Sequence, residues 1–167
     1  MVFDLSSGIT NGMNASYVLG QPDFTSDIDG GVSARTFDHN GGDSTLNLFF
    51  DSVNRRLFTS NSSDSRVLVF DMSEGVSTYM SASYVIGGTN FTIAEGGTTR
   101  SLFYGVNGPY FSNDVNKLYV ADGNNRIMIF DLSLSNTLLQ FSFTQPPTCS
   151  VYFTPSTITL GESVELS

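Results

Sequence analysis

The sequence predicts an all-β protein that is built from repeats. A five-residue phrase of the same pattern occurs three times, at residues 1–5, 68–72 and 128–132. A second segment, residues 15–20, returns almost unchanged as residues 82–87. Self-similarity over a long, nearly constant distance is a stronger guide to architecture than any single motif.

The distance between repeats is constant inside the matched segments and changes only between them. Asp4 and Asp71 are 67 positions apart, whereas Asp71 and Asp131 are 60 positions apart. The stretches in which the distance changes are rich in Gly, Ser and Asn. Insertions confined to such stretches are typical of loops between strands.

One complete repeat contains four short segments with strand character. They are rich in Val, Leu, Phe and Tyr, are bounded by turn residues, and span residues 46–51, 56–61, 66–72 and 82–87. The third segment is apolar on both faces, and a strand that is buried on both sides lies between two layers. Apolar residues at helical spacing are not sustained anywhere. Four-stranded antiparallel sheets stacked face to face around an axis are the blades of a β-propeller, and this is the architecture that we expect.

The other two repeats are incomplete. The first contributes only its last two strands, within residues 1–20, and the third contributes residues 106–111, 117–122 and 126–132, with residues 138–143 as a weak fourth strand. A closed propeller needs about 4 to 8 blades. We therefore expect an incomplete propeller of about 2 to 3 blades, which is either part of a longer polypeptide or completed by further copies of the chain.

Residues 117–131 resemble the core of an NHL repeat, in which a strand ending in Ala-Asp is followed by Asn-x-Arg-Ile and a phrase like Val-Phe-Asp. Residues 56–71 are similar but diverged, because Asn61 stands where Asp122 stands and one residue is added before Arg66. Residues 15–25 resemble NHL-type propeller repeats of bacterial surface proteins. The likeness covers residues 1–144 and implies a fold rather than a function, since propellers host many unrelated activities.

The pattern changes after residue 144. Residues 145–150 contain Pro146 and Pro147 and are expected to form a semi-rigid linker. Residues 151–167 no longer match the repeat and resemble the first two strands of a bacterial immunoglobulin-like domain. The expected organisation is therefore propeller blades, a linker and a partial immunoglobulin-like domain.

The composition limits the classes of partner. Seven Lys and Arg residues against 16 Asp and Glu residues give a net charge of -9, which repels phosphate backbones and anionic membranes. We expect no nucleic-acid partner and no membrane insertion. The single Cys cannot form an internal disulfide. The low Lys content, the many Thr, Ser and Asn residues and the immunoglobulin-like tail favour an extracellular or cell-surface location of the bacterial type.

Two polar loops were considered as sites of chemistry. Asp38, His39 and Asp43 could bind a divalent metal or act as acid and base, but the next repeat lacks these groups, which favours a solvated insertion. The turn after Asp122 weakly resembles a calcium loop, yet the twelfth position, where an EF-hand needs Glu, is Ser133. We predict no catalytic residue, no metal ligand and no cofactor.

The topology of a four-stranded blade predicts where a ligand would bind. The loop between the second and third strands emerges on the same face as the connector to the next blade. The connectors, residues 21–44 and 88–105, are much longer than the usual 2 to 6 residues, and long loops on rigid scaffolds commonly carry recognition. The ligand-binding residues predicted on this face are Asp38, His39, Asp43, Asn61, Asp64, Asn124 and Asn125.

A second set of polar residues recurs once per repeat and is predicted to be structural. It consists of Arg66, Asp71, Asp122, Arg126 and Asp131. Each arginine opens a third strand and is expected to bind a carboxylate or carbonyl group of the neighbouring blade.

The function that we expect is a non-catalytic binding module of an extracellular or surface multidomain protein. It would recognise a protein or a glycan through the loop face, and its other partners would be further blades, in the same polypeptide or in a second copy. The alternative is part of a propeller enzyme, of the calcium-dependent lactonase or lyase type, whose catalytic set lies mostly in other blades. A third alternative is a purely architectural spacer.

Overall fold

The protein is all-β in the part of the chain that the structure describes. The computed structural model describes residues 1–37, 46–133, 153–154 and 157–158, and these residues form strands, turns and loops without any helix. The chain divides into two compact units, Met1–Ser133 and Leu134–Ser167. The predicted all-β class is confirmed.

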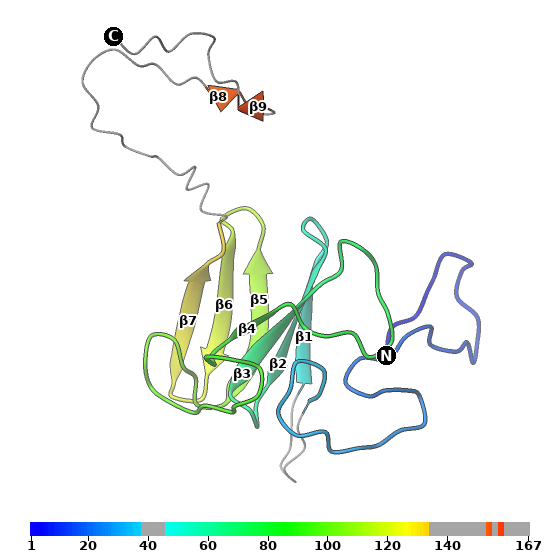
Figure 1. Ribbon diagram of the computed structural model, residues 1–167, viewed down its shortest axis with the longest axis horizontal. Helices are drawn as coiled ribbons and strands as arrows, with labels where there is room; N and C mark the ends of the chain where they lie inside the picture. Colours follow the sequence, from blue (N-terminus) through cyan, green and yellow to red (C-terminus); the bar gives the residue numbers. More distant parts are fainter. Residues whose placement is uncertain (38–45, 134–152, 155–156, 159–167) are drawn as a thin grey trace, which may run out of the picture. The chain divides into compact units, whose positions relative to one another are not determined.

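The complete repeat forms a four-stranded antiparallel sheet in the order β1-β2-β3-β4 (Figure 1). Its strands are β1 (Leu46–Asp51), β2 (Arg56–Asn61), β3 (Arg66–Asp71) and β4 (Tyr84–Ile86). The bounds of β1 and β2 are those predicted, and β4 is shorter than predicted. β3 is buried on both faces, as its apolar run predicts. The next repeat forms a second antiparallel sheet of β5 (Val106–Ser112), β6 (Lys117–Asp122) and β7 (Arg126–Asp131). The fourth strand predicted at residues 138–143 lies outside the described residues.

The first repeat does not form the two strands predicted within residues 1–20. It keeps an isolated antiparallel bridge between Val2 and Tyr17, which corresponds to the pairing of Val69 with Tyr84 in the first sheet. Among the described residues, this bridge pairs with no further strand and is not extended into a sheet. Residues 1–5 therefore form the expected bridge to Tyr17 but not the expected strand.

Two apolar cores lie on opposite sides of β3. The core between the two sheets contains Val67 and Val69 of β3 and the side chains that β5 and β6 turn toward them, and it is buried from both directions. Within it, the rings of Phe58 and Phe111 stack with their centroids 5.6 Å apart. The second core contains Leu68 and Phe70 on the other face of β3, covered by side chains from residues 19–37 and 72–91. Because side chains alternate between the two faces of β3, this one strand contributes to both cores.

The hairpin turns of the two sheets have the same backbone geometry. Arg55 and Asn116 precede β2 and β6 with positive φ values of 53° and 50°. Ser65 and Asn125 precede β3 and β7 with φ values of 53° and 55°. Asn tolerates this left-handed conformation better than Arg or Ser does. The repeat is therefore preserved in the turns as well as in the strands.

The repeated phrase also forms the same local hydrogen bond three times. Asp4, Asp71 and Asp131 each accept a bond from the backbone N–H of the serine two positions later, at 2.9, 2.9 and 3.0 Å. These serine bonds lower the pKa of the Asp4 and Asp71 carboxyls. Lys117, which lies 2.8 Å from Asp131, and then the serine lower the pKa of Asp131. All three aspartates act as turn residues.

The C-terminal unit is described only at β8 (Phe153–Thr154) and β9 (Thr157–Ile158), which pair antiparallel.

Candidate functional site

The connectors and the β2–β3 and β6–β7 turns meet at one end of the two sheets, which we call the connector end (Figure 1). Arg66 holds both connectors there. Its Nη1 donates to the Phe91 carbonyl at 2.8 Å, and its Nη2 donates to the Thr36 carbonyl at 3.3 Å and lies 2.8 Å from Asp64 Oδ2. The side chains of Arg66 and Asp64 are both almost fully buried. One buried ion pair therefore holds the backbone of both connectors, at Thr36 and at Phe91.

Arg126 has the corresponding position in the second sheet. Its Nη2 donates to the Leu102 carbonyl at 2.9 Å, as Arg66 does to Thr36, and its Nε donates to Asp122 Oδ2 at 2.6 Å. Asp122 Oδ1 also accepts the backbone N–H of Tyr104 at 2.9 Å. Burial raises the pKa of Asp122, but the bonds from Tyr104 and Arg126 outweigh it and the net pKa is lowered. Asp122 therefore remains a carboxylate that holds the second connector.

The carboxylate that pairs with each arginine comes from a different position in the two sheets. In the second sheet it is Asp122, the last residue of β6. In the first sheet Asn61 occupies that position and donates from Nδ2 to Asp64 Oδ2 at 2.7 Å, so the carboxylate comes from the turn. The expected partner was a carboxylate or a carbonyl group of the neighbouring blade. The carboxylate partner of each arginine lies in the same sheet or its turn, and the carbonyl partners lie in the connectors.

The predicted ligand-binding residues therefore differ in their exposure to solvent. Asn61 and Asp64 are buried and support Arg66, and Asn124 is partly buried, with its Nδ2 donating to Thr98 Oγ1 at 3.0 Å. Asn125 is exposed at the turn before β7. Asp38, His39 and Asp43 lie outside the described residues.

Large apolar side chains are exposed on both connectors. Phe24 and Ile28 are exposed on the first, and Ile93 and Tyr104 on the second. The first connector is closed by Gln21, whose amide accepts from Ile28 N–H at 3.1 Å and donates to the Ile28 carbonyl at 2.9 Å. It also contains a turn in which bonds from Ser26 and Thr25 lower the pKa of Asp23 to about 2. Both connectors thus display apolar groups on internally bonded backbone.

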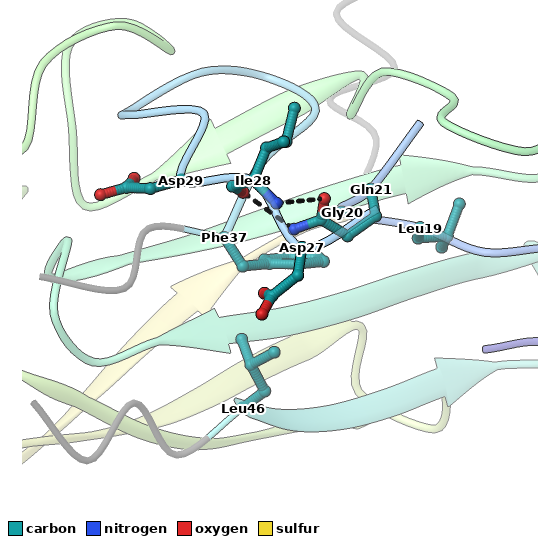
Figure 2. Close-up of a pocket in the computed structure, with 8 residues that line it drawn as sticks. All are labelled: Leu19, Gly20, Gln21, Asp27, Ile28, Asp29, Phe37 and Leu46. Atoms are coloured by element: carbon teal, nitrogen blue, oxygen red, sulfur yellow. Dashed lines mark hydrogen bonds between the residues drawn. The ribbon is translucent and has the colours of Figure 1, made fainter. Parts of the chain in front are cut away.

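A cavity of about 370 Å³ lies between the first connector and the start of β1 (Figure 2). Its apolar lining comes from Leu19, Phe37 and Leu46, and its polar lining from Gln21, Asp27 and Asp29. Figure 2 shows the Asp27 carboxylate pointing toward the space between Phe37 and Leu46, while Asp29 points away. The cavity is thus acidic and has an apolar floor.

In the second repeat the corresponding space is filled. Phe103 corresponds to Phe37, because their rings approach the positive-φ glycines Gly87 and Gly20 in the same way. Val106 corresponds to Leu46, because each pairs with the last residue of the following strand. Phe103 and Val106 are fully buried against the first sheet. The cavity is therefore the place that a preceding sheet would fill.

The cavity is not predicted by the sequence, although the length of residues 21–44 marks the connector beside it. The match of residues 15–20 with residues 82–87 extends to Phe37 and Phe103, which could have indicated that these two rings occupy equivalent positions. What the sequence could not show was that one of the two positions lacks a covering sheet.

Among the described residues, no three His, Cys, Asp or Glu side chains gather closely enough to hold a metal ion. The described part of the chain also contains no helix long and apolar enough to cross a membrane. Comparisons with protein families, with curated proteins and with solved structures give no match to this chain.

Proposed function

We propose that this chain is a non-catalytic binding module made of NHL-like β-propeller blades, and that it recognises a protein or a glycan through the connector end. The two sheets support the propeller assignment, because they stack face to face and repeat the same strand order, turn geometry and arginine anchor. Four-stranded sheets stacked in this way are the units of a propeller.

The observation that carries the proposal is the anchoring of the connectors. Long loops normally lose conformational entropy when they bind a ligand, and that loss weakens binding. Here Arg66 and Arg126 bind the carbonyls of Thr36, Phe91 and Leu102 in the free protein, so the connectors are already held at these points. Loops held on a rigid scaffold are well suited to recognition.

The chemistry of the exposed groups favours a polar ligand with an apolar face. Phe24 and Tyr104 present aromatic rings, and Tyr104 adds a hydroxyl that can donate or accept a hydrogen bond. Saccharides and the turns of protein surfaces combine hydroxyl or amide groups with apolar patches. A net charge of -9 disfavours strongly anionic ligands.

We further propose an extracellular or cell-surface setting of the bacterial type, in a multidomain protein with an immunoglobulin-like domain after the blades. The support is the short antiparallel pair β8–β9 in the expected segment, together with the acidic, Lys-poor composition.

The test is to present the full chain to an array of defined glycans and to a displayed peptide library. Ligands that bind are then measured against Tyr104→Ala at the connector end and Val53→Ala at the opposite, β1–β2 hairpin end. Both side chains are exposed, so neither variant perturbs the core. We expect Tyr104→Ala to weaken binding about tenfold or more and Val53→Ala to leave it unchanged. Loss of binding in Val53→Ala alone, or the absence of a ligand in both libraries, would contradict the proposal.

A further inference from the structure

The outer face of each stacked sheet carries exposed apolar side chains, although on the first sheet the outward side chains of β3, Leu68 and Phe70, are already covered. On the first sheet, Leu46, Leu48 and Phe50 of β1 point away from the second sheet, and Leu48 is 70% exposed. We call this surface, together with the neighbouring cavity, the tail. On the second sheet, Ile127 and Ile129 of β7 are 68% and 58% exposed on the face that also carries Tyr119, and we call this surface the head. Exposed contiguous apolar surface of this kind marks an interaction site.

The interface between the two sheets shows what each surface fits. Val67 and Val69, which correspond to Ile127 and Ile129, are buried there against the second sheet. On the other side of that interface, Val106, Pro109 and Phe111 are buried, and they correspond to Leu46, Leu48 and Phe50. The head is therefore a copy of one side of an existing interface, and the tail is a copy of the other side.

We propose that the head of one copy of this chain docks on the tail of a second copy, in the arrangement by which the second sheet packs on the first. In the internal interface, Phe58 stacks on Phe111. The corresponding pair between copies is Tyr119 with Phe50. Phe37 and Leu46 in the cavity are then covered, as Phe103 and Val106 already are.

Head and tail are different surfaces on opposite sides of the stack, so the contact is heterologous and can repeat from copy to copy. Closed rings of about 4 to 8 sheets correspond to two to four copies with two sheets each. Each copy carries a net charge of -9, which opposes association at low ionic strength. Added salt screens this repulsion, so we expect the association to strengthen from low to physiological salt.

The test uses sedimentation velocity on the full chain over a range of concentrations. Leu48→Glu blocks the tail and Ile129→Glu blocks the head. We expect the wild-type chain to associate and each variant alone to remain monomeric, because an unpaired carboxylate in the contact weakens it about 100-fold or more. An equimolar mixture retains one intact head and one intact tail, and therefore forms a 1:1 dimer and nothing larger. Val53→Glu, at an equally exposed hairpin position, is the matched control and associates like wild type.

Two results would overturn the proposal. A wild-type chain that stays monomeric at all concentrations shows that the faces do not take a second copy. Association of Leu48→Glu alone shows a symmetric contact that does not use the tail. Circular dichroism checks that the variants fold. If either does not, separate chains with Phe50→Cys and Tyr119→Cys, both in a Cys149→Ser background, decide the question: a short bis-maleimide, which spans the gap between facing sheets, joins them if the proposed register is correct and leaves them apart if it is not.

Discussion

The strands β3 and β7 have the same sequence pattern but different surroundings, and the difference shows what determines burial in this protein. Each begins with arginine, continues with four apolar residues and ends with aspartate. All four apolar residues of β3 are buried, whereas in β7 only Met128 and Phe130 face the core, and Ile127 and Ile129 are exposed. The contribution of such a residue to stability is therefore set by the sheet that packs against it.

The largest difference is expected between the two arginine anchors. Arg66 is buried with Asp64, whereas Arg126 is partly exposed beside the buried Asp122. Arg66→Ala leaves a buried carboxylate without its cation, which costs about 3 to 5 kcal/mol. Arg126→Ala should cost less, about 1 to 2 kcal/mol, because water reaches Asp122 when the side chain is removed. Urea unfolding of both variants measures the two costs, and equal costs would show that the anchors are energetically alike.

The second largest difference is expected between alanine substitutions at the equivalent glycines Gly87 and Gly20. A Cβ at Gly87 would lie 2.1 Å from the buried ring of Phe103 and 2.9 Å from the Ser65 carbonyl, whereas at Gly20 it would meet only the half-buried ring of Phe37. Both glycines have φ near +90°. Gly87→Ala combines backbone strain with overpacking and should cost about 2 to 4 kcal/mol. Gly20→Ala should cost about 1 to 2 kcal/mol, since Phe37 can move toward the cavity. Thermal unfolding compares the two variants. A larger cost at Gly20 would contradict the view that Phe37 has free space beside it in the cavity and Phe103 has none.

The hairpins of the two sheets are expected to respond differently to low pH, because only the first contains a buried aspartate, Asp51. It is fully buried and accepts bonds from Asn54 and Arg56, while the corresponding residue of the second sheet is Ser112. Burial raises the pKa of Asp51, but the bonds from Asn54 and Arg56 outweigh it and the net pKa is lowered. A carboxyl whose pKa is lower in the folded state adds stability above its unfolded pKa of about 4, and this is lost as the pH falls toward the folded value.

Asp51→Ser, which copies the second sheet, should therefore cost about 1 to 3 kcal/mol at neutral pH and reduce the loss of stability as the pH falls below the unfolded pKa of about 4. Chemical unfolding at a series of pH values checks this. An unchanged slope would assign the acid sensitivity to other carboxylates.

The smallest effect is expected at Arg55, whose φ of 53° is unfavourable for arginine. The second sheet has Asn116 at this position with nearly the same φ. Because Asn tolerates the left-handed region, Arg55→Asn should stabilise the chain by about 0.5 to 1 kcal/mol. The Asn116→Arg exchange in the second sheet is the reciprocal control and should destabilise by a similar amount in urea unfolding. If Arg55→Asn destabilised the chain, or Asn116→Arg stabilised it, side-chain contacts and not turn geometry would govern these positions.

Much of the fold could be predicted from the sequence, because strand boundaries depend on local alternation and turn residues. The bounds of β1, β2 and β6 followed from apolar runs between Ser, Asn, Asp and Gly. The two strands predicted within residues 1–20 do not form, because no neighbouring strand pairs with them among the described residues. In the site, the connectors could be selected by length, but the roles of Asn61 and Asp64 could not. Both look like solvated turn residues, and only the fold shows that they are buried with Arg66.

The most direct test of the central claim places Thr at two corresponding positions. Val69 is buried between the sheets and Ile129 is exposed on the head, while both are β-branched and central in their strands. Thr keeps the branching at both positions. Ile129→Thr also shortens the side chain by one carbon, but that carbon belongs to an exposed side chain, so the two variants differ mainly in what surrounds the hydroxyl. In urea unfolding of dilute, monomeric protein, Val69→Thr should cost about 2 kcal/mol, because its hydroxyl is buried, and Ile129→Thr less than about 0.5 kcal/mol. Equal costs would contradict the claim that a neighbouring sheet sets the contribution of each residue.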